Sequence, residues 1–185
     1  MREVEIKLRC DPAGLAALPA YLDARGYQAE EDGEETDRYY RHPDRDFQAT
    51  REVLRLRTVR DLRDGTTRAL LTYKGRNRAA LGQSREELEF GVSDPETAEA
   101  VLDRLGFREA DRVRKLRRTF RRDNRTFCLD TVEGLGAFLE IELLCPEAEE
   151  AAGRQELTAL LAELDFLHPA VEPKTYLELT RAAGE

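Results

Sequence analysis

The sequence predicts an α+β fold in which antiparallel strands form a sheet that closes, or nearly closes, into a barrel with helices packed outside. Strand-like segments that alternate charged with apolar residues recur along the chain, and helical segments lie between them. Successive side chains of a strand point to opposite faces, so each strand has one charged and one apolar face. If the charged faces share one side of a curved sheet, helices must cover the apolar side, and closure gathers the charges into a tunnel.

Alternation with a period of two residues marks the predicted strands. They are Glu3–Arg9, Val53–Val59, Ala69–Lys74, Glu86–Val92, Val113–Phe120, Thr126–Val132 and Phe138–Leu144. The acidic stretch Glu30–Glu35 is expected to be a solvated loop, because runs of like charge favour contact with water. Residues His42–Thr50 are expected to form a second loop, which we interpret as mobile.

Helical patterns separate the strands. They are Asp11–Arg25, Asp94–Leu105 and Glu147–Leu164, with a shorter terminal helix near Lys174–Arg181. The first two begin with Asp-Pro, which places an N-cap before a proline at the first helical position. Gly26 and Gly106 then suit the C-terminal caps. Pro19 is expected to interrupt the first helix, because a proline inside a helix removes a backbone hydrogen bond.

Two segments suggest an internal repeat. Residues 3–12 and 87–95 each run a Glu-x-Glu strand into an Asp-Pro helix, and each helix precedes Gly plus an aromatic residue, Tyr27 or Phe107. We interpret them as two related halves. A chance similarity of two strand–helix units is the alternative, because Asp-Pro is a common helix start.

The composition limits the class of protein. A chain of 185 residues, 41% of them apolar, is expected to form one domain over residues 1–185. Its charged fraction of 37% exceeds the roughly 25% typical of soluble proteins, so many charges must be solvated, paired or committed to a site. The net charge of -8 argues against binding to a nucleic-acid duplex or a membrane surface, which normally requires a basic surplus. A subset of the basic residues can still face one cavity and bind a small anion.

A cytoplasmic location is expected. Cys10, Cys128 and Cys145 are odd in number and widely spaced, so they favour neither a zinc site nor a disulfide framework. The chain starts with charged Arg2 and Glu3, and no segment approaches the ~20 apolar residues that span a bilayer.

The shared charged face combines acids with bases. Carboxylate oxygens are the ligands that Mg²⁺ and Mn²⁺ prefer. The acids are Glu3, Glu5, Glu87, Glu89, Asp130, Glu140 and Glu142. Guanidinium and ammonium groups bind phosphate oxygens. The bases are Lys7, Arg55, Arg57, Lys74, Arg85, Lys115 and Arg117.

Together these two sets predict phosphoryl transfer, because a metal neutralises phosphate oxygens that the acids would otherwise repel. For any single strand the alternative is an ordinary antiparallel strand with its charged face in water. Recurrence of a charged face on several strands favours a shared phosphoryl-transfer site. We therefore expect convergence on one cavity of Glu3, Glu5, Arg55, Arg57, Lys74, Glu140 and Glu142.

The same segments resemble the CYTH family, also called the triphosphate tunnel metalloenzymes. The N-terminal Glu3-x-Glu5-x-Lys7 looks like the family's signature. Further similar segments follow in the family's order: Leu54–Arg57, Thr72–Gly75, Arg85–Glu89, Lys115–Arg117 and Leu129–Glu142. The resemblance covers nearly the whole chain.

The resemblance implies an eight-stranded antiparallel barrel that binds divalent cations and a triphosphate inside. By similarity, the metal ligands or their neighbours are Glu3, Glu5, Asp130, Glu140 and Glu142. The phosphate-binding residues are Lys7, Arg55, Arg57, Lys74, Lys115 and Arg117, and Lys174 matches a further basic position near the C-terminus of several members. The catalytic residues expected among these are Glu3, Glu5, Lys7 and Lys74.

The resemblance leaves the reaction open. In a class IV adenylyl cyclase the ribose 3′ oxygen of ATP attacks the α-phosphorus, whereas in a triphosphatase water attacks the terminal phosphorus. Both reactions need the same metal and basic clamp. The segments Asp37–Tyr40 and Pro43–Phe47 resemble proteins grouped with class IV cyclases, so a cyclase-like activity on ATP is placed first.

The alternatives are a triphosphatase acting on tripolyphosphate, thiamine triphosphate or a nucleotide, and a non-catalytic module that binds nucleotide or polyphosphate. The presence of all the carboxylates disfavours the non-catalytic module. A homodimer is left open.

Overall fold

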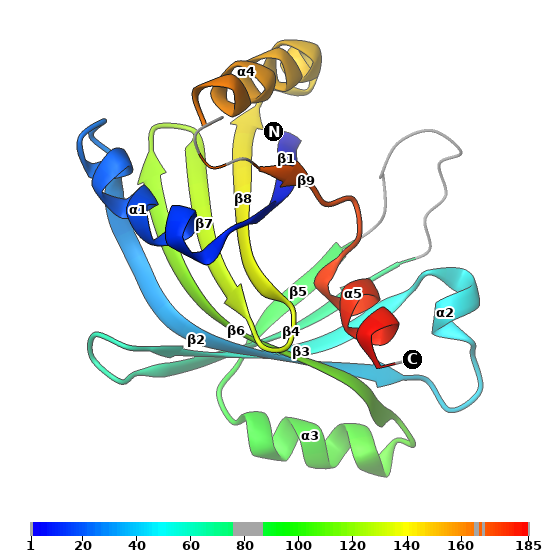
Figure 1. Cartoon of the computed structure of the whole chain (residues 1–185). Coiled ribbons are helices and arrows are strands. Elements are labelled where there is room, and N and C mark those ends of the chain that lie inside the picture. Colours follow the sequence, from blue (N-terminus) through cyan, green and yellow to red (C-terminus); the bar gives the residue numbers. More distant parts are fainter. Residues whose placement is uncertain (1, 76–86, 165–166, 168, 185) are drawn as a thin grey trace. The chain divides into compact units, whose positions relative to one another are not determined.

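The computed structural model describes residues 2–75, 87–164, 167 and 169–184 (Figure 1). These residues pack as two compact units. The first unit comprises residues 2–33, 115–164, 167 and 169–183, and the second unit comprises residues 34–75 and 87–114. Within this part of the chain, no helix has the length and apolar character needed to cross a bilayer.

The strands form one antiparallel sheet in the order β5-β4-β3-β2-β6-β7-β8-β1-β9. β2 (Gln28–Arg41) and β6 (Arg108–Arg122) run through both units. The order contains nine strands rather than the eight implied by the resemblance, and the additional one is the two-residue β9 (Ala170–Val171). Because the order ends at β5 and β9, the hydrogen-bonded ladder does not close among the described residues.

The first unit places helices over one face of its strands (Figure 1). Besides β2, β6 and β9, its elements are β1 (Arg2–Cys10), α1 (Pro12–Asp23), β7 (Arg125–Val132), β8 (Gly136–Cys145), the 3₁₀ turn η1 (Glu147–Glu149), α4 (Glu150–Glu163) and α5 (Tyr176–Ala183). Leu18 of α1 and Leu157 of α4 pack in one core with Leu139 and Ile141 of β8. Each such side chain contributes about 1.5 to 3 kcal/mol when buried. The predicted covering of the apolar face by helices is therefore confirmed within this unit.

The β1–β8 ladder keeps the charged side chains together. Glu5 lies opposite Glu142 and Lys7 opposite Glu140, whereas Ile6 lies opposite Ile141. Because paired residues share a face and successive residues alternate, this register directs the glutamates and lysine away from α1 and α4.

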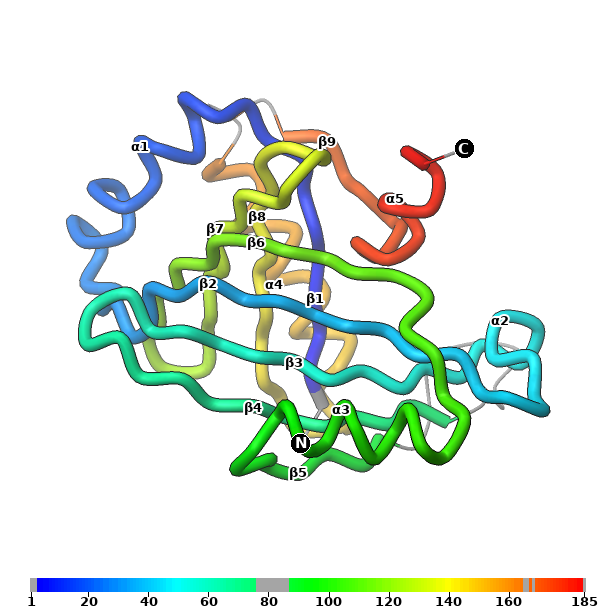
Figure 2. The backbone as a smooth tube through the Cα atoms, turned by 90° about the horizontal axis from the view of Figure 1, so that it is seen from below, coloured from blue at the N-terminus to red at the C-terminus, as the bar shows by residue number. Residues whose placement is uncertain are grey.

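The second unit repeats this arrangement with fewer helices. Its further elements are α2 (Phe47–Thr50), β3 (Val53–Asp61), β4 (Thr67–Lys74), β5 (Glu87–Val92) and α3 (Pro95–Arg104). Leu102 of α3 packs with Leu54 and Leu56 of β3 and with Ala69 of β4. Figure 2 shows α3 lying over the strands of this unit. The charged residues of β3 and β4 consequently occupy the opposite face.

The acidic stretch Glu30–Glu35 corrects one prediction, because it belongs to β2 rather than to a solvated loop. Glu30 pairs with Arg121 and Asp32 with Arg118, so ion pairs to β6 replace the apolar alternation by which strands are recognised. Farther along β2, Glu35 is only 4% exposed.

Two local predictions near the helices are also corrected. α1 runs through Pro19 without a break, and Leu18 and Leu22 on either side of it are completely buried. Burial of these side chains offsets the hydrogen bond that the proline removes. The segment expected as a loop contains α2, whose N-cap Asp46 accepts hydrogen bonds from the N–H groups of Gln48 and Ala49.

Gly26 and Gly106 generate a prediction about stability. Both follow a helix with positive φ, 78° and 89°, which favours glycine. A Cβ at Gly106 would lie 3.3 Å from Pro43, whereas one at Gly26 would meet nothing within 4 Å. Gly26→Ala should lower the free energy of unfolding by about 1 to 2 kcal/mol, the cost of the left-handed conformation.

Gly106→Ala should lower the free energy of unfolding by more than Gly26→Ala does, because the added Cβ would lie close to Pro43. Urea unfolding of both variants measures the difference. An equal or smaller decrease for Gly106→Ala would show that the contact with Pro43 adds nothing to the cost of the substitution.

Candidate functional site

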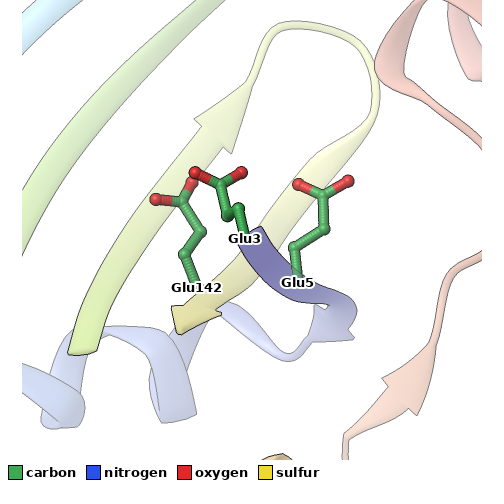
Figure 3. Close-up of side chains that lie close together, drawn as sticks. All are labelled: Glu3, Glu5 and Glu142. Carbon is green, nitrogen blue, oxygen red and sulfur yellow. The ribbon is translucent and has the colours of Figure 1, made fainter. Parts of the chain in front are cut away.

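Three carboxylates form an acidic triad, which we define as Glu3 and Glu5 of β1 and Glu142 of β8 (Figure 3). Their carboxylate oxygens lie within 4.8 Å of one another, so they can share one cation. Glu3 and Glu5 are exposed and Glu142 is half-buried, which leaves the triad open to a ligand.

The electrostatics of the triad favour a cation. Burial and the neighbouring Glu3 carboxylate raise the pKa of Glu142 to about 7, and Arg117 offsets part of this rise. Like charges so close together require a proton or a cation between them. Mg²⁺ and Mn²⁺ take carboxylate oxygens and keep bound waters, so a partly open set of three glutamates fits either ion.

Asp130 is paired with basic neighbours. It is completely buried on β7. Arg117 of β6 donates to both of its oxygens, at 2.7 Å from Nε to Oδ1, and also to Glu140. Lys115 Nζ lies 3.5 Å from Asp130. Burial alone would raise the pKa of Asp130, but Arg117 and Lys115 hold it below its usual range.

Tyr176 of α5 also reaches this charged face. Its hydroxyl donates to Asp130 Oδ2 at 2.8 Å, and its ring packs edge-on against Phe138. Lys7 Nζ lies 4.5 Å and Lys115 Nζ 5.2 Å from the ring centre. The aromatic ring therefore stabilises two ammonium groups that the sequence predicts to bind phosphate.

The charged face of the second unit centres on Asp37 of β2. Arg57 donates to both of its oxygens, at 2.6 Å from Nε and 2.7 Å from Nη2. Arg57 Nη1 also lies 3.3 Å from Glu35. Arg55 donates to Thr72 at 3.2 Å and lies 3.8 Å from Asp37. Two buried acids, 4% and 3% exposed, thus compensate two arginines.

The edge of this face carries the remaining predicted residues. Lys74 forms an ion pair with Glu87 at 3.0 Å. Glu89 accepts a hydrogen bond from the Thr72 hydroxyl at 2.6 Å and lies 3.7 Å from Arg55. Basic neighbours therefore compensate these two glutamates.

The structure groups the predicted residues by unit. The first unit gathers the triad, Glu140, Asp130, Lys7, Lys115 and Arg117, and the second gathers Arg55, Arg57, Lys74, Glu87 and Glu89. Their convergence on one cavity stays a prediction. Lys174 is exposed in the turn before α5, and Arg85 lies outside the described residues.

Sequence reasoning missed Glu35, Asp37 and Tyr176 as members of these clusters. The alternation of Glu35, Asp37 and Tyr39 along β2 was an available signal, because it places all three on one face. Nothing in the pattern around Tyr176 showed that α5 turns this side chain toward Asp130.

The raised pKa of Glu142 predicts a pH dependence of stability. A carboxyl whose pKa is higher in the folded state favours folding at low pH, and this contribution is lost as pH rises from near 4.5 through about 7. Without divalent cations, the wild type should lose thermal stability relative to Glu142→Gln between pH 5.5 and 8.5. Adding Mg²⁺ should reverse the loss.

Thermal unfolding with a chelator and then with Mg²⁺ measures both effects. A constant difference in Tm between wild type and variant would show that Glu142 carries an ordinary pKa.

Known proteins resemble this chain in sequence and in fold. The sequence matches the CYTH domain over residues 1–176. A Methanocaldococcus jannaschii protein, provisionally named adenylate cyclase MJ0240, is 32% identical over 97% of this chain and 98% of its own length. The structure of the PH1819 protein of Pyrococcus horikoshii is 34% identical, with a TM-score of 0.78 over 96% of this chain and 97% of that one.

A more distant structure shares the fold. A Hippeastrum protein, provisionally named an adenylyl cyclase and described as having a dominant triphosphatase activity, is 21% identical, with a TM-score of 0.69 over 98% of this chain and 96% of that one. The family match over nearly the whole chain confirms the resemblance seen in the motifs. The chain belongs to the CYTH family.

Proposed function

We propose that this chain is a divalent-metal-dependent phosphoryl-transfer enzyme that acts on a triphosphate, with conversion of ATP to cyclic AMP and pyrophosphate placed first. The observation that carries the proposal is the acidic triad on a face that also holds Lys7, two residues from Glu5 on β1. Family membership and the name of the M. jannaschii relative support the same class of substrate.

The acidic triad would hold Mg²⁺ or Mn²⁺, because its three carboxylate oxygens lie close enough together to share one cation. A divalent cation there would neutralise phosphate oxygens as charge develops in the transition state. We assign Glu140 and Asp130 to the orientation of Arg117, since both bind its guanidinium.

Phosphate oxygens would be bound by the basic residues with donor capacity left. Lys7 is 3.9 Å from Glu140, a loose ion pair, and Arg55 has only distant carboxylates at 3.7 and 3.8 Å. Lys74 adds a compact charge at the edge of the second unit. Each of these groups would bind phosphate oxygens, and positioning of the phosphates for in-line attack is the larger part of catalysis in phosphoryl transfer.

In the cyclase reaction the ribose 3′ oxygen bonds to the α-phosphorus, the bond to pyrophosphate breaks, and the hydroxyl proton is released. In a triphosphatase, water bonds to the terminal phosphorus and the remaining diphosphate leaves. The second reaction is our second candidate, because the same residues serve it and the Hippeastrum neighbour is described as a triphosphatase.

One assay distinguishes the candidates. The protein is incubated with ATP, tripolyphosphate or thiamine triphosphate in Mg²⁺ or Mn²⁺, and cyclic AMP, pyrophosphate and orthophosphate are separated. Cyclic AMP with pyrophosphate from ATP supports the cyclase. Orthophosphate without cyclic AMP supports the triphosphatase, and with tripolyphosphate as substrate the orthophosphate is accompanied by pyrophosphate. Binding without turnover would identify a non-catalytic module, and neither binding nor turnover would overturn the proposal.

Glu142→Gln should lower metal affinity and turnover at least about 10-fold, because the amide keeps the shape but loses the charge. Glu140→Gln should instead weaken triphosphate binding, since it releases Arg117 and leaves the triad complete. Titration with Mn²⁺ and with a nonhydrolysable triphosphate separates the two effects.

Glu133→Gln, in the exposed turn between β7 and β8, is the matched control and should change neither affinity. Wild-type metal affinity in Glu142→Gln would exclude this residue as a ligand.

Arg55→Ala should weaken triphosphate binding by about 1 to 3 kcal/mol for each charge-assisted hydrogen bond that the substitution removes. Arg57→Ala should weaken binding too, and should also lower Tm because it leaves Asp37 buried without its bidentate partner. Calorimetric titration and thermal unfolding measure the two quantities.

Arg63→Ala, which removes an exposed partner of Asp61, serves as the control. Unchanged affinity in both Arg55→Ala and Arg57→Ala would place these arginines outside the phosphate site.

A further inference from the structure

We propose that Asp37 is a positioning residue that orients Arg55 and Arg57 for phosphate binding without touching the substrate itself. The inference rests on the proposed function and extends it to a residue of β2. Asp37 is 3% exposed, and both of its oxygens already accept hydrogen bonds from Arg57. A buried, fully engaged carboxylate can act on a ligand only through the groups that it holds.

Asp37 fixes the plane of the Arg57 guanidinium and restricts the position of the Arg55 guanidinium. Bidentate pairing through Nε and Nη2 leaves Arg57 a single orientation. Arg55 Nη1 lies 3.8 Å from the same carboxylate, and its Nη2 donates to Thr72. The Tyr39 hydroxyl donates to Asp37 Oδ2 at 3.4 Å and restrains the acid itself.

The first unit contains the same constellation around Asp130. Arg117 binds both oxygens of Asp130, Lys115 lies 3.5 Å away, and the Tyr176 hydroxyl donates to it. In each unit one buried aspartate therefore binds one arginine bidentately, a second cation loosely and one tyrosine hydroxyl. The recurrence indicates a functional arrangement of side chains rather than an isolated surface ion pair.

The two constellations are related by exchange of charge between strands. Gly26 and Gly106 follow α1 and α3, respectively. Asp37 and Arg117 are separated by the same number of residues as these two glycines, so they occupy equivalent positions after the two helices. In the second unit's pair the acid, Asp37, lies on β2, the strand that follows α1. In the first unit's pair the base, Arg117, lies on β6, the strand that follows α3. The bidentate pair therefore recurs in the two units with its charges exchanged between corresponding strands.

Stability alone is a weak reason for such a pair. Taking a carboxylate and a guanidinium out of water costs several kcal/mol each, so a buried ion pair contributes little net stability compared with apolar residues of similar volume. A preoriented guanidinium, in contrast, loses less rotational freedom when it binds a phosphate. The benefit of Asp37 is therefore expected in ligand affinity.

The test compares Asp37→Asn and Asp37→Glu with the wild type. Asp37→Asn should weaken binding of a nonhydrolysable triphosphate in Mg²⁺ by about 10- to 100-fold, since the charge that orients both arginines is removed. Asp37→Glu should restore part of the affinity, because it restores the charge. Metal affinity should stay unchanged in both variants, because the acidic triad belongs to the other unit.

Two controls separate orientation from stability. Leu56→Val lies on the apolar face of β3, so it should lower Tm while keeping the wild-type affinity. Asp61→Asn removes a half-buried acid of the same strand that pairs with Arg63, and it should keep the wild-type affinity. Equal affinities in Asp37→Asn and the wild type, or a decrease in affinity in Leu56→Val as large as in Asp37→Asn, would overturn the positioning role.

A ligand-free measurement keeps this inference distinct from the proposed function. In ¹⁵N NMR spectra the Arg57 Nε–H should exchange slowly with water in the wild type and rapidly in Asp37→Asn. Slow exchange in both would overturn the inference whatever the protein binds. Rapid exchange in Asp37→Asn together with a wild type that binds no triphosphate would instead refute the proposed function and leave Asp37 as the group that orients Arg57.

Discussion

Bidentate pairing of a buried aspartate with an arginine is the interaction on which both charged faces depend. A sheet whose one face is apolar and covered by helices must carry its charges on the other face, where many of them are shielded from water. Asp37 with Arg57, and Asp130 with Arg117, offset that cost by charge-assisted hydrogen bonds at both oxygens. The other cations of each face are arranged around these two pairs.

The acidic triad has an opposite character, because its members repel one another. Glu5 faces Glu142 directly across the β1–β8 ladder, and Glu3 lies within reach of both. The raised pKa of Glu142 expresses the free energy that this repulsion and burial cost. On strands that elsewhere pair acids with bases, three glutamates whose oxygens lie this close form a site suited to a ligand of positive charge.

The alternation of single strands was enough to predict which face carries the charges, and it located β1, β3, β4, β7 and β8. It could not predict partners, because a period of two assigns a side chain to a face and not to a neighbour. Glu140 and Asp130 were therefore grouped with Glu142, although Arg117 binds them both. β2 was missed for a related reason: Glu30 and Asp32 are stabilised by arginines of β6, and no apolar alternation marks that stretch.

The two Glu-x-Glu strands differ in the groups that their glutamates meet. β1 and β5 each lead into a helix capped by an aspartate, Asp11 or Asp94. On β5, Glu87 and Glu89 face Lys74 and Thr72 of β4, so each glutamate has a basic or hydroxyl partner. On β1 the corresponding glutamates meet Glu142. The neighbouring strand therefore decides which groups each pair of glutamates meets: Glu142 of β8 beside β1, and Lys74 and Thr72 of β4 beside β5.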